Sequence, residues 1–203
     1  MENKSKLTVK DTVSKMIWKI EHPIDKGSAT ALLANLRNSA QTELSNSNNI
    51  WPFLFENMPE EFLSTNGQET PEEAAIVTTL QLYAICMQGS SATVRNDEGF
   101  AGSIGASLKA GKIASEDTTA LDRRFNVLIS KDTFPGLVYQ LRSIVKLVKS
   151  KATLTINFPK LAEDLYSYQK FDPKKVMMKW AIDYYRSPDS QTKETKQEDI
   201  DHD

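Results

Sequence analysis

Residues 134–151 read FPGLVYQLRSIVKLVKSK, and this stretch decides the fold class. Four aliphatic side chains recur in it at the spacing of one helix face: Leu137, Leu141, Ile144 and Val148. Pro135 stands in what would be the first turn, where a helix tolerates proline. The stretch therefore predicts a helix that buries one apolar stripe against neighbouring helices.

The same pattern extends outward along most of the chain. All eight prolines fall where a turn or the first turn of a helix is expected. Thr70 and Glu73 form a capping box with Pro71 at the first helical position, and Gly111 is expected to end a short helix. Further helices are predicted at about residues 12–20, 28–37, 71–87, 104–110, 115–130, 157–168 and 173–186. With the strand-like stretch 152–158 taken as a connector, the sequence predicts an all-α, two-lobed helical bundle protein.

Length and composition narrow the class of protein. The chain has 203 residues, of which 39% are hydrophobic, enough for one domain or a closely joined pair with a real core. A single cysteine and two histidines exclude a disulfide framework, a cysteine-based zinc site and a histidine-rich metal site. No apolar run approaches the ~18 residues of a membrane helix, and the first residues do not resemble a signal peptide. We therefore expect a cytoplasmic protein with no membrane contact and no cofactor.

Charge divides the chain into three segments. Residues 1–101, the acidic half, hold 8 Lys/Arg against 13 Asp/Glu, and residues 102–186, the basic half, hold 15 against 8. Residues 187–203 hold 2 against 6 and contain one aliphatic residue, so we expect a disordered acidic tail. We expect an acidic helical lobe, then a basic helical bundle, joined by a small, polar, glycine-rich linker at 88–102. A basic module inside an acidic protein points to a polyanion partner, although a solvated lysine-rich helical surface is the alternative.

The candidate site residues are cations of the basic half. Arg142, Lys146 and Lys149 recur at helical spacing on a second face of the 134–151 helix, and no acid lies between residues 134 and 158. These cations therefore have no acidic partner in their own helix, and a face with only cations is typical of one that follows phosphates. Six further cations are candidates for the same contact: Arg123, Arg124, Lys109, Lys112, Lys175 and Lys179. Arg124 is equally a candidate for packing, and because most aromatic residues are expected inside, base stacking is not expected.

No catalytic constellation emerges from the sequence. Three glycines precede a predicted helix, Gly99, Gly102 and Gly105, but no strand leads in and no Lys-Ser/Thr pair follows. Paired carboxylates such as Glu72 and Glu73 are adjacent, so they diverge on a helix. Cys86 ends an apolar helix and is expected to be a buried small hydrophobe. We expect no catalytic residue and no metal ligand.

The order of motifs along residues 28–186 resembles the CasB family, the small subunit of the type I-E CRISPR Cascade complex. In the first half the resemblance rests on ATALLANLR at 29–37 and IWPFL at 50–54. In the second half it rests on GASLKA at 105–110, DRRFNVLI at 122–129, LRSIVKLV at 141–148, FPKLAEDL at 158–165 and VMMKWAIDYY at 176–185. Each motif is degenerate, so their order, spacing and total length carry the resemblance.

The resemblance implies an all-helical, non-enzymatic subunit. Such proteins sit as a pair along an RNA-guided surveillance complex, among crRNA-guided Cascade subunits, and help to hold the target and displaced DNA strands of the R-loop. Guide pairing then reads the sequence while the protein supplies backbone contacts. The acidic half departs from a uniformly basic binder, so we expect it to face protein neighbours or a second copy of the chain. Two alternatives stay open: a helical adaptor that binds only protein, and an enzyme of unfamiliar type.

Overall fold

The computed structural model describes residues 7–40, 42, 44–90, 94–95, 102–113, 118–151 and 154–186. Within these residues it contains α-helices, three short 3-10 helices and no strand, which confirms the all-α fold class. The α-helices are α1 (Val9–Glu21), α2 (Lys26–Ser39), α3 (Trp51–Asn57), α4 (Pro71–Met87), α5 (Ile104–Ile113), α6 (Thr118–Ile129), α7 (Phe134–Lys151), α8 (Phe158–Lys170) and α9 (Pro173–Tyr185). The 3-10 helices are η1 (Leu44–Asn46), η2 (Asn48–Ile50) and η3 (Glu60–Phe62). The expected acidic tail lies outside the described residues.

The starts of α4, α8 and α9 follow the sequence closely, whereas α1 and α2 begin three and two residues before the starts expected at 12 and 28. The capping box of α4 is confirmed, since Glu73 N donates to Thr70 Oγ1 at 3.1 Å and Thr70 N donates to Glu73 Oε2 at 2.8 Å. Asn157 caps α8 and Asp172 caps α9 through their side chains, as expected. These caps satisfy N–H groups that have no partner inside the helix. Helix α3 was not predicted, because its seven residues are too few for the apolar spacing to repeat.

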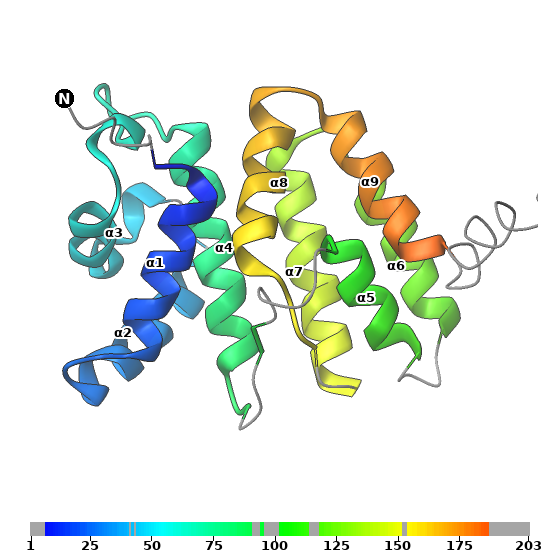
Figure 1. Ribbon diagram of the computed structural model, residues 1–203, viewed down its shortest axis with the longest axis horizontal. Helices are drawn as coiled ribbons and strands as arrows, with labels where there is room; N and C mark the ends of the chain where they lie inside the picture. The colour runs from blue at the N-terminus through cyan, green and yellow to red at the C-terminus, as the bar shows by residue number, and fades with distance from the viewer. Residues whose placement is uncertain are drawn as a thin grey trace, which may run out of the picture.

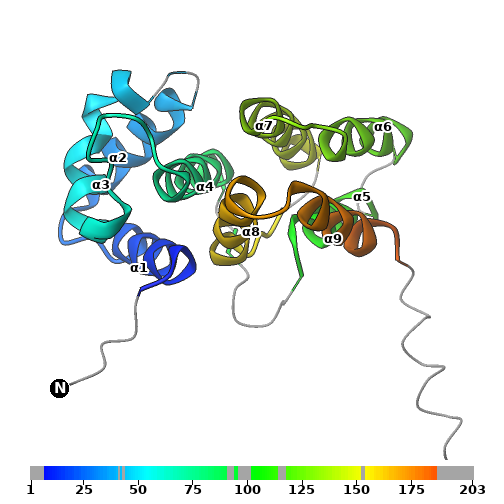
Figure 2. The same ribbon diagram turned by 90° about the horizontal axis from the view of Figure 1, so that it is seen from above.

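The helices form two rows with α2 and α3 at one end. Figure 1 shows α1, α2 and α3 at one end of the molecule, α4, α7 and α8 in the middle, and α5, α6 and α9 at the other end. Seen from above in Figure 2, α4, α7 and α6 follow one another along one side, and α1, α8 and α9 along the other. Neighbouring helices in each row pack against each other, and α8 also packs against α4. This arrangement places α7 and α9 on different sides of the molecule.

Helix α8 connects the acidic and basic halves. It packs more extensively against α4 and α1 than against α9, its neighbour in sequence. One continuous cluster of buried side chains therefore includes residues of both halves, from Val13 on α1 to Trp180 on α9. Trp180 is fully buried, as the apolar stripe of α9 predicts. A lobe boundary near residue 101 stays a prediction, and the core is continuous across it.

Two glycines mark close helix contacts. The expectation that Gly111 ends its helix is wrong, because α5 continues to Ile113 and a Cβ at Gly111 would overlap Val148 Cγ1 of α7. Gly105 likewise lies against the carbonyl oxygen of Trp180, where no side chain fits. Both glycines therefore permit close packing rather than ending a helix. In the connector before α8, Ile156 N donates to Val94 O at 2.9 Å, so part of the expected linker is tied to the core.

Candidate nucleic-acid interface

Arg142 and Lys149 of α7 face α4. The Arg142 guanidinium donates to Gln81 Oε1, and Gln81 Nε2 donates in turn to Ser39 Oγ of α2 at 3.0 Å. The Lys149 ammonium donates to Ile85 O at 2.7 Å and to Gln88 O, at the C-terminal end of α4. A cation at this end of a helix satisfies carbonyl groups that have no partner inside the helix and complements the helix dipole.

Burial sets the electrostatics of this contact. Burial lowers the pKa of the Arg142 guanidinium and that of the Lys149 ammonium. The charge of Glu69 opposes the effect on Arg142. Arg142 Nε is buried and has no hydrogen-bond partner among the described residues. The premise that these two cations lack local partners is therefore wrong. Their partners are an amide and carbonyl oxygens from another helix, which counting acids along the sequence cannot reveal.

Lys146, on the same helix, is exposed, and it lies one turn after the residue of α7 that Arg124 of α6 contacts. Arg124 Nη1 donates to Ser143 Oγ at 3.0 Å, and Ser143 stands one turn before Lys146 on α7. Arg123 and Arg124 are both exposed. We call Arg123, Arg124 and Lys146 the α6–α7 basic surface. Tyr139, also exposed on α7, was missed by the expectation that the aromatic residues lie inside.

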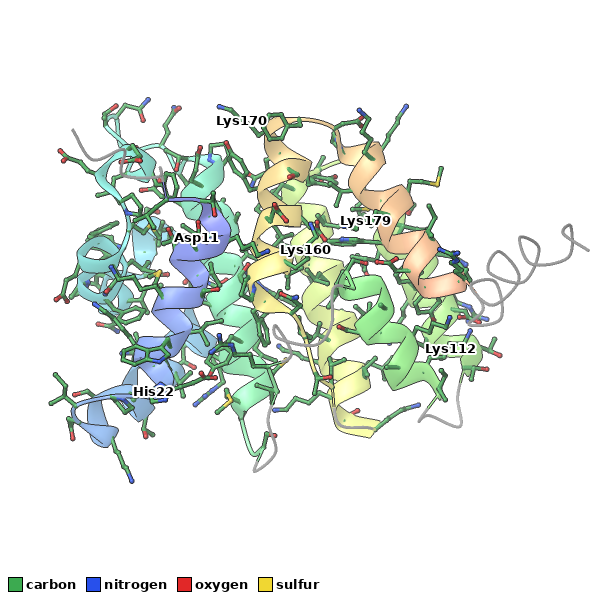
Figure 3. The ribbon with its side chains drawn as sticks, viewed as in Figure 1. Asp11, His22, Lys112, Lys160, Lys170 and Lys179 are labelled. Atoms are coloured by element: carbon green, nitrogen blue, oxygen red, sulfur yellow. The ribbon has the colours of Figure 1, made fainter. Side chains whose placement is uncertain are left out.

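The two candidates on α5 are engaged in contacts within the protein. Lys112 forms an ion pair with Asp122 Oδ1 at 2.5 Å, and its ammonium lies 5.3 Å from the ring centroid of Tyr184. Lys109 donates to the carbonyl oxygen of Arg186, which is the last described residue after α9. Figure 3 shows Lys112 near the end of the molecule formed by α5, α6 and α9. These two lysines hold helices together.

Lys175 and Lys179 lie exposed on α9. Lys175 is 4.0 Å from the Asp172 carboxylate, and its side chain is 85% exposed. Figure 3 shows Lys179 on the same face of the molecule as Lys160 of α8. Helix α9 belongs to one row of helices and α7, which carries Lys146, to the other (Figure 2). Of the nine candidates, Arg142, Lys149, Lys109 and Lys112 are half-buried in contacts within the protein, and the other five are exposed, although Arg124 among them also contacts α7.

Most described acids of the basic half are engaged in structural contacts. Asp164 is buried, accepts from Trp180 Nε1 at 2.9 Å and pairs with Lys160 at 2.7 Å, and Glu163 pairs with the same lysine. Asp122 accepts from Lys112 and from the Tyr184 hydroxyl, and Ser103 N donates to the carboxylate of Asp183. These acids are therefore unavailable to neutralise the exposed cations of the α6–α7 basic surface.

Other kinds of site were also sought. Burial raises the pKa of the Cys86 thiol to about 12, so the residue is a buried hydrophobe rather than a nucleophile. Among the described residues, no group of three His, Cys, Asp or Glu side chains is placed to hold a metal ion. None of the described helices is long and apolar enough to cross a membrane.

Comparisons with known proteins identify the family. A sequence model described as CRISPR-associated protein Cse2 matches residues 32–185. Among solved structures, CasB from Thermobifida fusca is similar, with a TM-score of 0.66 and 24% identity, over 88% of this chain and 99% of that one. A Cse2-family CRISPR-associated protein from Thermus thermophilus gives a TM-score of 0.63 at 19% identity, over 89% and 100% of the two chains. CasB from M. ruber gives 0.62 at 20% identity, over 89% and 94%.

A search of curated proteins gave no match. The structural similarities, all at low identity, show a shared fold, whereas the family model spans well over half of the chain. The expected resemblance is thereby confirmed, and the chain belongs to the CRISPR-associated Cse2 family.

Proposed function

We propose that this protein is a non-catalytic subunit of an RNA-guided CRISPR effector complex of the Cascade type, where it contacts nucleic-acid backbone and stabilises the R-loop. The observation that carries the proposal is the α6–α7 basic surface. Arg123, Arg124 and Lys146 are exposed, while Asp122, Asp164 and other described acids of the basic half are engaged in contacts within the protein. Exposed cationic side chains of this kind contact phosphates, and such contacts do not depend on the base sequence.

The energetics of strand exchange suit this role. Forming an RNA–DNA heteroduplex in place of a DNA duplex is nearly balanced, so a few backbone contacts are enough to favour the R-loop. Lys175 and Lys179, exposed on α9, offer a second, smaller contact for nucleic-acid backbone. A second copy of the chain in the complex, implied by the family resemblance, belongs to the same proposal.

Salt dependence of DNA binding tests the proposal directly. The variant Arg123→Gln/Arg124→Gln/Lys146→Gln is compared with the full-length chain for binding to two single-stranded DNAs of unrelated sequence. We expect the variant to bind both DNAs more weakly by the same factor. Each lost phosphate contact lowers the magnitude of the salt slope by about 0.7. The control, Lys10→Gln/Lys15→Gln/Lys26→Gln, removes the same charge from exposed positions of the acidic half and keeps the slope of the native chain.

The adaptor alternative gives a different result. If the exposed cations pair with acids of a partner protein, the α6–α7 variant keeps the native salt slope and instead fails to join the effector complex. If the salt slope is unchanged and assembly is lost, the α6–α7 basic surface contacts a partner protein and not nucleic acid. If both the salt slope and assembly are unchanged, the α6–α7 basic surface contacts neither nucleic acid nor a partner protein.

A further inference from the structure

The acidic half contains a preformed apolar pocket of about 760 Å³. Its walls come from η1, α3 and the segment between η3 and α4, and they include Leu44, Trp51, Phe55, Leu63 and Glu69. The pocket opens to solvent on a part of the molecule that the nucleic-acid proposal does not use. Its volume lies within the range of about 300–1,000 Å³ that is usual for ligand-binding clefts.

Internal contacts hold the aromatic wall in place. Trp51 Nε1 donates to Leu44 O at 2.9 Å, which fixes the indole against η1, and the rings of Trp51 and Phe55 lie 6.1 Å apart. Phe55 is 44% exposed, so much of its phenyl ring is accessible to a partner. Gly67 lines the pocket at a φ of 79°, and no atom lies within 4 Å of where its Cβ would stand. The pocket is therefore open, and contacts within the protein hold its aromatic wall.

The stretch of sequence that forms this pocket has acidic side chains and no basic ones. Between Arg37 and Arg95 the chain contains seven glutamates and no lysine, arginine or histidine. Glu56 follows Phe55 directly and is exposed, and Glu69 lines the pocket and is exposed. Glu73 also lines it, but its carboxylate accepts from Ser64 N and Thr70 N and so serves the start of α4.

We propose that this pocket binds a protein segment that inserts one large apolar side chain and carries lysine or arginine on both sides of it. The apolar volume and the exposed phenyl ring select the anchor, and anchors of this kind dominate binding energy at protein interfaces. The surrounding glutamates select the flanking cations and repel phosphate, so the occupant is a basic protein segment and not a nucleic acid. The proposal does not depend on the nucleic-acid function, because it concerns another surface.

Nuclear magnetic resonance of the full-length ¹⁵N-labelled chain tests the pocket with a synthetic peptide. The probe has a central Leu-Phe flanked on each side by two lysines. One control peptide carries glutamate in place of lysine, and a second carries Ala-Ala in place of Leu-Phe. We expect the probe to shift the indole signal of Trp51 while that of Trp180, buried and bonded to Asp164, stays in place. We expect either control peptide to bind at least about tenfold more weakly.

Variants of the chain assign the contact to the pocket. Phe55→Ser should weaken binding of the probe at least about tenfold, whereas Phe171→Ser, which removes a phenyl ring 72% exposed in the basic half, should leave it unchanged. Glu56→Gln/Glu69→Gln should weaken binding and flatten its salt dependence. The matched control Asp132→Asn removes an exposed carboxylate of the basic half and should change neither.

Three results would overturn the proposal. One is equal binding of the Ala-Ala peptide, which would show attraction by charge alone. Another is a Trp51 signal that does not move at millimolar probe. The third is self-association of the native chain in sedimentation that Phe55→Ser abolishes, which would make a second copy of this chain the occupant.

Discussion

Lys149 on α7 donates a hydrogen bond of 2.7 Å to the carbonyl oxygen of Ile85 in the last turn of α4. A second bond from the same ammonium reaches Gln88 O, just beyond the helix. A cation of the basic half thus closes the end of a helix that belongs to the acidic half. This contact separates the role of Lys149 from that of Lys146, three residues earlier on the same helix.

Lys149→Ala is expected to destabilise the fold, whereas Lys146→Ala is not. Lys149→Ala removes two charge-assisted bonds to helix-end carbonyls, a loss of about 1–2 kcal/mol in the free energy of unfolding. Lys146 is exposed, so its substitution should stay within about 0.5 kcal/mol. Urea-induced unfolding of both variants measures the difference. Equal stabilities would show that the Lys149 ammonium is as solvated as that of Lys146, which is the alternative that the sequence left open.

Trp180→Ala is expected to cost about 3–5 kcal/mol, as large truncations in a packed core do. The indole is fully buried, and its loss also deprives the buried Asp164 carboxylate of a donor at 2.9 Å. Trp18→Ala is the matched control, because Trp18 is 55% exposed on α1. Thermal unfolding of the two variants tests this assignment, and a melting temperature unaffected by Trp180→Ala would contradict it.

Gly111→Ala is expected to destabilise the protein unless Val148 is shortened as well. The added methyl group would overlap Val148 Cγ1, so it forces α5 and α7 apart at a cost of about 1–3 kcal/mol. Val148→Ala alone leaves a small cavity, whereas the double variant removes the overlap. A double-mutant cycle on unfolding free energies should therefore give a double variant more stable than the sum of the two losses. Strict additivity would place Gly111 out of contact with Val148.

Asp122 should make stability depend on pH in the acid range. Its hydrogen bond from Lys112 is the main cause that lowers the pKa of the Asp122 carboxyl below its ordinary value of 3.8, with the Tyr184 hydroxyl contributing. A lowered pKa in the folded state stabilises the protein above pH 3.8, and this contribution disappears as pH falls through the folded-state pKa. Asp122→Asn should therefore be less stable than the native chain at neutral pH, with the gap shrinking in acid. Chemical unfolding of both proteins across this range measures the gap, and Asp132→Asn is the exposed control.

Local patterns in the sequence were enough to predict most helices. Caps and prolines decide where α4, α8 and α9 begin, because they satisfy backbone groups within a few residues. Gly111 was misread because a helix-ending glycine and a packing glycine look alike in sequence. Only the position of Val148, on a distant helix, distinguishes them.

The candidate site was predictable only as a set of residue types. The sequence identified a cationic face on 134–151 but could not show that Arg142 and Lys149 turn toward α4, since their partners are a buried amide and main-chain carbonyls. It could not show the apolar pocket either, because Leu44 of η1, Phe55 of α3 and Leu63 of the segment after η3 are brought together only by the fold. The type of a side chain tells which contacts it can make. Which partner it meets depends on the packing of elements far apart in the sequence.

The position of α8 between α1 and α4 also governs how the chain is made. About 70 residues separate the end of α4 from the start of α8. At about 5–20 residues per second, a ribosome takes roughly 4–14 s to synthesise them. During that interval the apolar sides of α1 and α4 that α8 will cover are open to other nascent chains and to chaperones. A message cut before residue 170 therefore encodes a product that cannot close its core, and we expect such fragments to aggregate in the cell.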